Sequence, residues 1–390
     1  MIGGLRSPRA SDNIPDRSNI MRIGVLKETS PHERRVALLP DGIGTLVKAG
    51  VEVVVEAGAG AAAGASDEAY AQAGATIAPD ARGACTGAAA VIKVQPPTVE
   101  EAERLDPGTL LVSLLPTSEQ QDLLRVLAER RITALALERV PRISRAQSMD
   151  VLSSQATLAG YKGVLLGASS LPRILPMLTT AAGNIRPAKA FVLGAGVAGL
   201  QAIATAKRLG AVVSAFDVRA AAREQVQSLG ATFVAAELAS DAAQDKGGYA
   251  KAQSEDEQQR TQALLDAHLK EMDLVVSTAA IPGRRAPLLI TEEMVRHMKP
   301  GSVIVDLAAE TGGNCALTKP GETVEANGVL ILGPLNLAST VPVHASQMLN
   351  RNVLTLLQYL LRDGALAIDL DDEITGAMAV THAGEVRVSG

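Results

Sequence analysis

The chain has 390 residues, of which 47% are hydrophobic and 20% are charged. This length predicts two or three globular domains with large buried cores, and the composition excludes a disordered chain. There is no Trp, and with only four Tyr and three Phe the core must be built from Ala, Val, Leu and Ile. So few aromatic rings argue against stacking platforms, and the net charge of −5 argues against nucleic acid as a partner.

The first 20 residues are polar without an apolar run, so they are not a secretory signal, and we expect a disordered leader before a first strand at Met21. No stretch reaches the ~18–20 uninterrupted apolar residues of a membrane-spanning helix. Cys85 and Cys315 have no CxxC spacing, which is typical of reduced thiols in a cytosolic protein. The histidines form no HxH or HxxxH pair, so we expect no metal site.

Short β-branched runs alternate with Ala-rich helical stretches, such as Gly42–Ala49 and Val197–Leu209. This alternation predicts an α/β fold with parallel sheets and helices on both faces. The expected strands are Met21–Leu26, Val51–Glu56, Ala90–Val94, Thr109–Leu114, Thr133–Ala136, Ala190–Leu193, Val212–Asp217, Leu274–Ser277, Val303–Asp306 and Val329–Leu332.

The two halves of the chain are joined by Ser144–Gly167, which has the pattern of a polar loop leading into a helix. An apolar helix at Val343–Leu361 follows the last strand and would return the chain to the first half, making the first domain discontinuous. We therefore expect a leader at 1–20, a first domain at 21–145 and 343–390, and a second domain at 146–342. The polar, Gly-bearing stretch at about 241–259 predicts an exposed loop in the second domain.

The string Gly194-Ala195-Gly196-Val197-Ala198-Gly199 is a GxGxxG motif between an expected strand and an Ala-rich helix. In that context it predicts a dinucleotide site. Gly194 would allow the tight turn, Gly196 the approach of the backbone to a pyrophosphate, and Gly199 the close packing of helix on strand. The helix N-terminus would supply N–H groups and a positive dipole.

Asp217 ends the second strand of this unit, where a carboxylate can accept both ribose hydroxyls of the adenosine. A 2′-phosphate would meet like charge there, which favours NAD(H) over NADP(H), although Arg219 lies nearby. Thr278 and Ala279 follow a later strand and Leu307 follows another. Loops at those strand ends would cover the nicotinamide half of the cofactor.

A conventional dehydrogenase needs a general acid or base beside the carbonyl carbon of its substrate. In the first half, Arg35 and Lys93 could together hold a carboxylate, but no histidine lies near Lys93 or in Leu110–Ser118. The polar cluster that precedes the linking helix is a second candidate, with spacings that could place Gln147 and Asp150 on one helical face. Its members are Arg142, Gln147, Asp150 and Ser153.

These residues lie in stretches that resemble the NAD(H)-binding alpha component of proton-translocating NAD(P) transhydrogenase, which is related to alanine dehydrogenase. The resemblance extends from about Met21 to the C-terminus, although Leu332–Gln347 departs from the usual family sequence while keeping Asn336. The motifs that carry it are PRISRAQSMDVLSSQATLAGY (Pro141–Tyr161), Gly194–Val213, Asp217–Ala231, GGYAK (Gly247–Lys251) and MKPGSVIVDLAAETGGNC (Met298–Cys315).

The resemblance implies two Rossmann-like, doubly wound domains flanking a cleft. It places Arg142, Gln147 and Asp150 in a loop against the nicotinamide and its ribose, with Ser153 beside them, and Tyr249 in a mobile loop that closes over the nucleotide. The nucleotide site as a whole then comprises Gly194, Gly196, Val197, Gly199, Asp217, Val218, Arg219, Tyr249, Thr278, Ala279, Leu307 and Asn336.

The resemblance also implies a reaction in which hydride passes directly from NADH on this chain to NADP⁺ on a beta subunit. Such a step needs no acid or base, because neither nicotinamide exchanges a proton at the reacting carbon. Gln147 would orient the dihydronicotinamide. The implied partners are that NADP(H)-binding subunit, a membrane-spanning subunit and a second copy of the chain, on the cytoplasmic face of the inner membrane.

Two other functions remain open from the residues. An alanine dehydrogenase would use Arg35 and Lys93 for the oxo-acid, but its catalytic histidine would fall near Leu114–Leu115, where this sequence has none. Turnover of pyruvate by the isolated chain would favour that function. A non-catalytic NAD-sensing module is the other alternative, and the absence of hydride transfer with the NADP-binding component would favour it.

Overall fold

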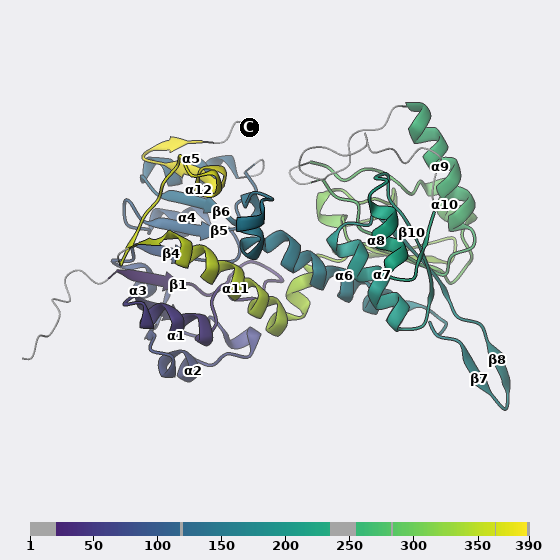
Figure 1. Cartoon of the computed structure of the whole chain (residues 1–390), viewed down its shortest axis with the longest axis horizontal. Helices are drawn as coiled ribbons and strands as arrows, with labels where there is room; N and C mark the ends of the chain where they lie inside the picture. The colour runs from purple at the N-terminus through teal and green to yellow at the C-terminus, as the bar shows by residue number, and fades with distance from the viewer. Residues whose placement is uncertain (1–20, 118–119, 235–254, 282–283, 363, 388–390) are drawn as a thin grey trace, which may run out of the picture.

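The structure, a computed structural model, describes residues 21–117, 120–234, 255–281, 284–362 and 364–387. It contains two main β-sheets that lie side by side, with helices on both faces of each (Figure 1). The predicted α/β class and the doubly wound parallel sheets are therefore confirmed. The expected leader at 1–20 and Tyr249 lie outside the described residues.

The first sheet has the strand order β19-β18-β6-β5-β4-β1-β2-β3. Its parallel part, β3-β2-β1-β4-β5-β6, is the doubly wound order that reverses direction beside the first strand. β18 pairs antiparallel with β6 and brings the C-terminal part of the chain into this sheet. The strands are β1 (Arg22–Val25), β2 (Glu52–Glu56), β3 (Thr76–Ala78), β4 (Ala90–Ile92), β5 (Leu110–Ser113), β6 (Thr133–Ala136), β18 (Ala379–His382) and β19 (Glu385–Val386).

Aliphatic side chains bury both faces of the first sheet. One face packs against α1 (Pro40–Lys48), α2 (Asp67–Gln72), α11 (Pro342–Leu360) and α12 (Glu373–Met378). The other packs against α3 (Ala81–Cys85), α4 (Val99–Glu103) and α5 (Gln121–Glu129). Tyr70 is the large aromatic side chain in this core, and its hydroxyl donates to the Leu38 carbonyl at 2.8 Å.

The second sheet has the order β11-β10-β9-β12-β13-β15-β14, which repeats the doubly wound pattern with one antiparallel edge strand. α7 (Val197–Arg208) and α8 (Ala222–Ser228) cover one face, and α9 (Glu255–Leu269) and α10 (Glu292–His297) cover the other. The strands are β9 (Lys189–Leu193), β10 (Val212–Phe216), β11 (Thr232–Phe233), β12 (Leu274–Ser277), β13 (Val303–Asp306), β14 (Thr323–Ala326) and β15 (Val329–Leu332).

The chain passes between the sheets twice (Figure 1). The first crossing is α6 (Val151–Ser170), which begins in the core of the first sheet with Val151 and enters the core of the second with Val164. The return crossing is the stretch 336–341, which contains the 3₁₀ helix η7 (Leu337–Thr340) and leads into α11. The domain boundaries at 145/146 and 342/343 stay predictions.

Two small antiparallel ribbons stand apart from the main sheets. β16 (Leu361–Arg362) pairs with β17 (Ala365–Leu366), and β7 (Leu178–Thr180) pairs with β8 (Gly183–Ile185). The β7–β8 hairpin projects from the second domain away from the rest of the molecule (Figure 1). Neither ribbon was predicted from the sequence, because their strands are too short to show an alternating pattern.

One predicted boundary needs correction. The exposed loop was expected to extend to residue 259, but α9 begins at Glu255, so its last five positions belong to a helix. Polar composition alone does not distinguish a loop from the solvent-facing part of a helix.

Glycines let α6 lie close to the second domain. A Cβ at Gly160 would collide with the Ala198 carbonyl of α7, one at Gly163 would meet Leu307, and one at Gly167 would collide with Leu274. These glycines recur every three or four residues and therefore line one face of the helix. The absence of side chains at these positions allows α6 to approach the second sheet closely.

Gly160→Ala should lower the free energy of unfolding by about 1–3 kcal/mol, because the added methyl overpacks the contact with Ala198. Gly44→Ala in α1 is the matched control. A Cβ there meets nothing nearer than the Ala73 carbonyl oxygen at 3.8 Å, so helix propensity alone should raise stability by about 0.5–1 kcal/mol. Urea titrations of both variants measure the difference, and equal midpoints would contradict this role for the close contact.

Candidate functional site

The GxGxxG turn joins β9 to α7 and has the geometry that each glycine was expected to supply. Gly194 has a φ of 92°, in the left-handed region that favours glycine. A Cβ at Gly199 would collide with the Gly194 carbonyl oxygen, so the helix can pack against the turn only without a side chain there. A Cβ at Gly196 would have no atom of the described residues within 4 Å, so the backbone at this position faces open space within that part of the chain, at the start of the helix.

This open space lies at the point where the order of the second sheet reverses. β9 has β10 on one side and β12 on the other, and ligands of doubly wound sheets bind outside the carboxyl ends of such strands. Val197, the first residue of α7, is 40% exposed. The turn therefore offers a helix N-terminus, exposed backbone and room for an anionic group.

Asp217 follows β10 and is only 6% exposed. Its Oδ2 accepts the backbone N–H of Ala195 at 2.7 Å and Nη2 of Arg219 at 2.7 Å. Its Oδ1 accepts the backbone N–H of Arg219 at 2.9 Å and the Arg219 Nε at 2.8 Å. The hydrogen bond and charge of Asp217 raise the pKa of Arg219 despite partial burial. Val218, the residue between Asp217 and Arg219, packs against the hydrophobic core on the sheet face that α9 and α10 cover.

The loops after β12 and β13 are tied to the turn and to each other. Thr278 donates through Oγ1 to the carbonyls of Leu193 and Gly194, at 3.2 and 3.0 Å. The Ala279 backbone is held in both directions by the Asn314 side chain, at 3.1 Å to its N–H and 2.8 Å to its carbonyl. These contacts place Thr278 and Ala279 beside the GxGxxG turn, Gly194–Gly199, which is called the fingerprint below.

The buried carboxylate of Asp306 organises this region. The sequence indicated a loop at this strand end, but the hydrogen-bond network of the carboxylate was not predicted. Asp306 accepts Ser277 Oγ at 2.9 Å, Thr318 Oγ1 at 2.7 Å and the backbone N–H groups of Asn314, Cys315 and Ala308 at 2.7, 3.0 and 3.1 Å. The carboxylate thereby fixes the loop after β13. Its place at the end of an apolar strand was the available signal.

Leu307, next in the chain, packs against Gly163 of α6. It was predicted to contact the nucleotide, and the contact that the structure shows is with the linking helix. It therefore couples the loop after β13 to the first crossing.

The polar cluster before α6 is arranged differently from the prediction. Gln147 lies in the 3₁₀ helix η4 (Ser144–Met149), whereas Asp150 has extended backbone and is the N-cap of α6. The expectation that the two share one helical face is therefore wrong, because the extended backbone at Asp150 separates η4 from α6. Asp150 accepts the N–H and Oγ of Ser153 at 2.9 and 2.6 Å, which is the N-cap geometry that favours Asp.

Gln147 is exposed, and within the described part of the chain its side chain makes no hydrogen bond. Arg142 is also exposed and has an interaction partner. η4 is anchored near its start by Arg145, which donates to Asp372 Oδ2 at 3.0 Å and to Tyr359 Oη at 3.1 Å. The loop thus holds Gln147 at the surface on a fixed support.

Asn336 lies on the return crossing rather than beside the fingerprint contacts. It has a φ of 43°, its backbone N–H donates to Glu310 Oε1 at 2.7 Å, and its side chain donates to Glu33 Oε2 at 2.9 Å. Its side chain also donates to the His32 carbonyl at 3.4 Å, so the hydrogen bonds of Asn336 in this structure include two carboxylates of the chain.

The two cations considered for an oxo-acid are each paired with a carboxylate of the chain. Arg35 Nη2 lies 2.6 Å from Glu33 Oε2, and Lys93 Nζ lies 2.9 Å from Glu101 Oε2. Both cations are buried, Lys93 to 1% exposure. Nearby, burial raises the pKa of Glu28 to about 7, although Lys93 and two backbone N–H groups oppose the shift. Glu33, Glu101 and Glu28 were not predicted as site residues from the sequence.

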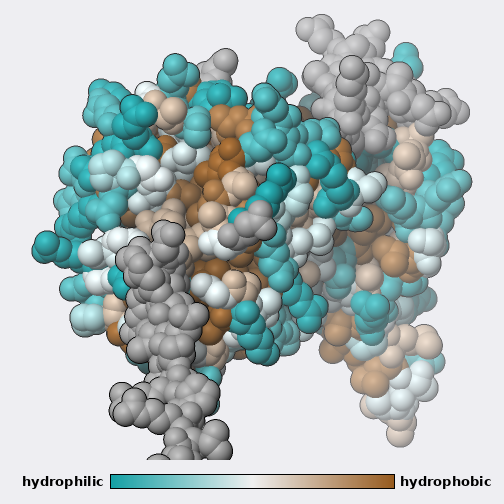
Figure 2. Space-filling view, turned by 60° about the vertical axis from the view of Figure 1, so that its left-hand side comes forward, coloured by the Kyte–Doolittle hydropathy of each residue, from teal (hydrophilic) through white to brown (hydrophobic). Residues whose placement is uncertain are grey.

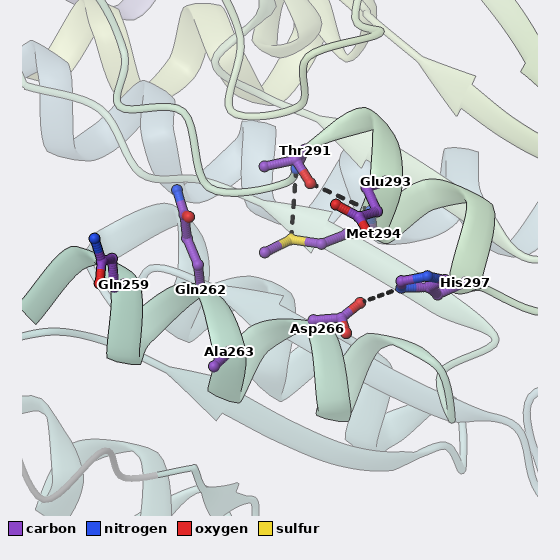
Figure 3. Close-up of a pocket in the computed structure, with 8 residues that line it drawn as sticks. All are labelled: Gln259, Gln262, Ala263, Asp266, Thr291, Glu293, Met294 and His297. Carbon is purple, nitrogen blue, oxygen red and sulfur yellow. Dashed lines mark hydrogen bonds and ion pairs between the residues drawn. The ribbon is translucent and has the colours of Figure 1, made fainter.

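A hollow of about 300 Å³ lies between α9 and α10, and its lining includes none of the predicted site residues. Figure 3 shows Asp266 on α9 and His297 on α10 facing each other, with 2.7 Å between Asp266 Oδ1 and His297 Nδ1. Asp266 also pairs with Lys270 at 2.8 Å. The lining residues are Gln259, Gln262, Ala263, Asp266, Thr291, Glu293, Met294 and His297.

Three further features bear on the chemistry. Within the described ranges, no group of three or more His, Cys, Asp or Glu side chains is placed to hold a metal ion. No helix among the same residues is long and apolar enough to cross a membrane. Burial raises the pKa of the Cys85 thiol to about 12 and also raises that of Cys315, which leaves both poor nucleophiles at neutral pH.

Two domain families match the chain: "Alanine dehydrogenase/PNT, N-terminal domain" over residues 24–159 and "Alanine dehydrogenase/PNT, C-terminal domain" over residues 163–389. The chain is 46% identical to a NAD(P) transhydrogenase alpha subunit protein of Rhodospirillum rubrum, with 94% of this chain and 97% of that protein aligned. The match to the crystal structure of transhydrogenase from Sinorhizobium meliloti has a TM-score of 0.86 and 44% identity, over 94% of this chain and 100% of that one.

An L-alanine dehydrogenase structure is also similar, with a TM-score of 0.80 and 30% identity over 94% of this chain and 96% of that chain. The family matches together span nearly the whole chain, and the transhydrogenase alpha relatives share more of the sequence than the alanine dehydrogenase does. The chain therefore belongs to the alanine dehydrogenase/PNT family, and within it is similar to the transhydrogenase alpha subunits.

Proposed function

We propose that this chain is the NAD(H)-binding component of a proton-translocating transhydrogenase, passing hydride directly between NADH and NADP⁺ held by a beta subunit. The observation that carries the proposal is the open backbone at Gly196, at the switch point of the second sheet and beside the Asp217 carboxylate. The 46% identity to a transhydrogenase alpha subunit supports the choice of reaction.

The residues at the fingerprint fit NAD(H). The pyrophosphate would lie against Gly196 and the N-terminus of α7, where no described residue would obstruct a Cβ. Asp217 would accept the hydroxyls of the adenosine ribose. All four lone-pair positions of this carboxylate are taken by Ala195 and Arg219, so the ribose must displace side-chain bonds of Arg219. A 2′-phosphate would add negative charge beside Asp217, which favours NAD(H).

The other end of the dinucleotide would extend toward the loop before α6. Asp150 precedes the Gly160–Ala198 contact by ten residues, which is about 15 Å along a helix. A dinucleotide held at Gly196 could therefore place its nicotinamide near Gln147. Asp150 and Ser153 would act by capping α6 and so fixing this loop, and Arg142 and Gln147 would contact the nicotinamide and its ribose.

When bound, the dihydronicotinamide supplies the hydride. The chain then has to orient the ring and exclude water, because hydride transfer between two nicotinamides needs no general acid or base. Gln147 is suited to orienting the dihydronicotinamide ring, since its amide is exposed and makes no hydrogen bond to another described residue. Tyr249, outside the described residues, is proposed to close over the nucleotide.

The partners follow from the same proposal: an NADP(H)-binding beta subunit, a membrane-spanning subunit that couples hydride transfer to proton translocation, and a second copy of the chain. The complex would lie on the cytoplasmic face of the inner membrane. Support for the second copy comes from exposed apolar side chains at the β7–β8 hairpin. They are Ile174, Met177, Leu178 and Ile185. Figure 2 shows hydrophobic (brown) surface near the projecting end of the molecule at the lower right.

The alanine dehydrogenase alternative is disfavoured by the pairing of its two cations. Arg35 and Lys93 are paired with Glu33 and Glu101, so a substrate carboxylate would have to displace an intramolecular partner of each buried cation. Assaying the isolated chain with NADH, pyruvate and ammonium tests this directly. Turnover at ordinary dehydrogenase rates would establish the alternative.

The first prediction concerns Gly196. Gly196→Ala should weaken NADH binding by roughly tenfold or more, because the methyl occupies the space proposed for the pyrophosphate, while the unfolding midpoint stays unchanged. Gly199→Ala should instead lower the unfolding midpoint, because its methyl would collide with the Gly194 carbonyl oxygen. NADH fluorescence titration and thermal melts separate the two. Unaltered NADH affinity in Gly196→Ala would refute the placement.

The second prediction concerns Gln147. Gln147→Asn should slow hydride transfer about 10- to 100-fold, because the shortened amide misplaces the dihydronicotinamide, and NADH affinity should hardly change. The measurement is stopped-flow transfer from NADH to an NADP⁺ analogue with the NADP-binding subunit present. Gln227→Asn, an exposed amide on α8, is the control. A wild-type rate for Gln147→Asn would remove this residue from the mechanism.

The third prediction concerns the second copy. Met177→Lys, at a side chain that is 68% exposed, should weaken self-association at least about tenfold, because a charge would be buried in an apolar contact. Sedimentation velocity over a concentration series measures the change. Leu288→Lys places the same charge at another exposed apolar residue and should have no effect. If both variants self-associate like the wild type, the hairpin is not the contact.

A further inference from the structure

The switch point of the first sheet is filled by charged side chains of the chain itself. β1 and β4 are neighbours there, and the loops that follow them hold Glu33, Arg35 and Lys93. In a doubly wound sheet this is where a ligand binds. Here Arg35 and Lys93 instead pair with Glu33 and Glu101. In this chain, the position where such a sheet binds a ligand is occupied by ion pairs between the chain's own side chains.

The Glu33–Arg35 pair is the most enclosed part of this network. The exposed fractions of the two side chains are 0% for Glu33 and 4% for Arg35. Burial would raise the pKa of Glu33, but the hydrogen bonds and charge of Arg35, with hydrogen bonds from Gln95 and Asn336, lower it to about 2. The carboxylate is therefore ionised throughout the physiological range.

The Glu33 carboxylate holds the return crossing. Its Oε2 accepts the Asn336 side chain at 2.9 Å, and its Oε1 accepts Ser339 Oγ at 3.1 Å. Ser339 Oγ in turn accepts the backbone N–H of Arg34 at 2.7 Å. The same segment continues along α11, where Val36 N–H donates to Ser346 Oγ at 3.0 Å.

The Arg35 guanidinium holds the first crossing. Its Nη1 donates to Gln155 Oε1 of α6 at 2.9 Å. Gln155 Nε2 donates to the Ala345 carbonyl of α11 at 3.2 Å. A single buried ion pair therefore contacts both segments by which the chain passes between its two sheets.

The backbone on both sides of the contact adopts left-handed conformations. His32, next to Glu33, has a φ of 64°, and Asn336 has a φ of 43°. Non-glycine residues adopt this left-handed region uncommonly, and they persist there when surrounding contacts hold them. Asn336 is held from two directions, by Glu33 at its side chain and by Glu310 at its backbone N–H.

We propose that Glu33 is a positioning residue: paired with Arg35, it holds both crossings and so fixes the angle between the two sheets and the distance between the two ends of the proposed dinucleotide site. This inference rests on the proposed NAD(H)-binding function. Without the carboxylate, Arg35 would be buried unpaired and the return crossing would lose its anchor. The sheets would then sample a range of angles, and NADH would have to order them on binding.

Spin labels across the junction measure the angle without any nucleotide. Asp122→Cys on α5 and Glu322→Cys in the second domain provide exposed attachment points, and the native Cys85 and Cys315 are buried. Pulsed electron spin resonance gives the distance distribution between the labels in the full chain. Dilution with unlabelled protein removes distances between copies.

In this background, Glu33→Gln should broaden the distance distribution and weaken NADH binding about 3- to 10-fold. Ser339→Ala removes the hydroxyl on the return crossing and leaves the ion pair in place, so it tests the same claim if Glu33→Gln does not fold. It should broaden the distribution less. The double variant should be no broader than Glu33→Gln alone, because both changes release the same crossing.

Glu138→Gln is the control, since Glu138 is another enclosed carboxylate, accepting the backbone N–H of Leu115 at 3.0 Å within the first domain. It should leave the distance distribution unchanged. Wild-type distributions in Glu33→Gln and Ser339→Ala, or equal broadening by Glu138→Gln, would overturn the proposal. If the Glu33→Gln variant shows a broader distance distribution but the wild-type chain does not bind NADH, the proposed function is refuted. The role of Glu33 in holding the crossings would still be supported.

Discussion

The close approach of α6 to the second sheet is the constraint on which the rest of the structure depends. This helix begins in the core of the first sheet and reaches α7, β12 and the loop after β13 through Gly160, Gly163 and Gly167. Its first residues follow the loop that holds Gln147, and its glycine face touches the unit that contains the fingerprint. One rigid element therefore sets the separation between the two ends of the proposed dinucleotide site.

Buried carboxylates fix the loops around that helix. Asp306 holds the loops after β12 and β13, Asp217 holds the fingerprint turn, and Glu33 holds the junction between the sheets. Each is surrounded by N–H or O–H donors, which is the condition under which burial of a charge is tolerated. Asp217 differs from the other two in its place beside the GxGxxG turn, where it accepts the Ala195 N–H and the Arg219 side chain. In the proposed site, the ribose would compete with Arg219 for this carboxylate.

Much of the fold could be predicted from local pattern. The strands expected at Thr133–Ala136, Leu274–Ser277 and Val303–Asp306 have those bounds in the structure, because buried parallel strands are short apolar runs bounded by turn residues. The fingerprint was found because glycine spacing and its context are encoded within about 25 residues. Short edge strands such as β3 and β14 were missed, since half-exposed strands of three or four residues show too little alternation.

The contacts at the junction could not be predicted, because they join residues some 300 positions apart. Glu33 meets Asn336 and Ser339 only after both sheets have formed. Arg35 was considered from its position as a residue that could hold a substrate carboxylate, and in the structure it pairs with Glu33. Gln147 and Asp150 were placed on one helical face because spacing alone does not show that an N-cap breaks the helix between them. The Asp306 network was missed for the same reason as the junction, since its donors come from separate loops.

The central claim is that hydride passes directly from a nucleotide on this chain to one on a partner, with no proton exchange at the reacting carbon. The most direct measurement uses NADH stereospecifically deuterated at C4, mixed with the chain, the NADP-binding subunit and NADP⁺ in ordinary water. Mass spectrometry of the NADPH formed should show deuterium from the transferred position retained at C4. Formation of NADPH with hydrogen from the solvent at C4, or no NADPH at saturating nucleotide, would contradict direct transfer.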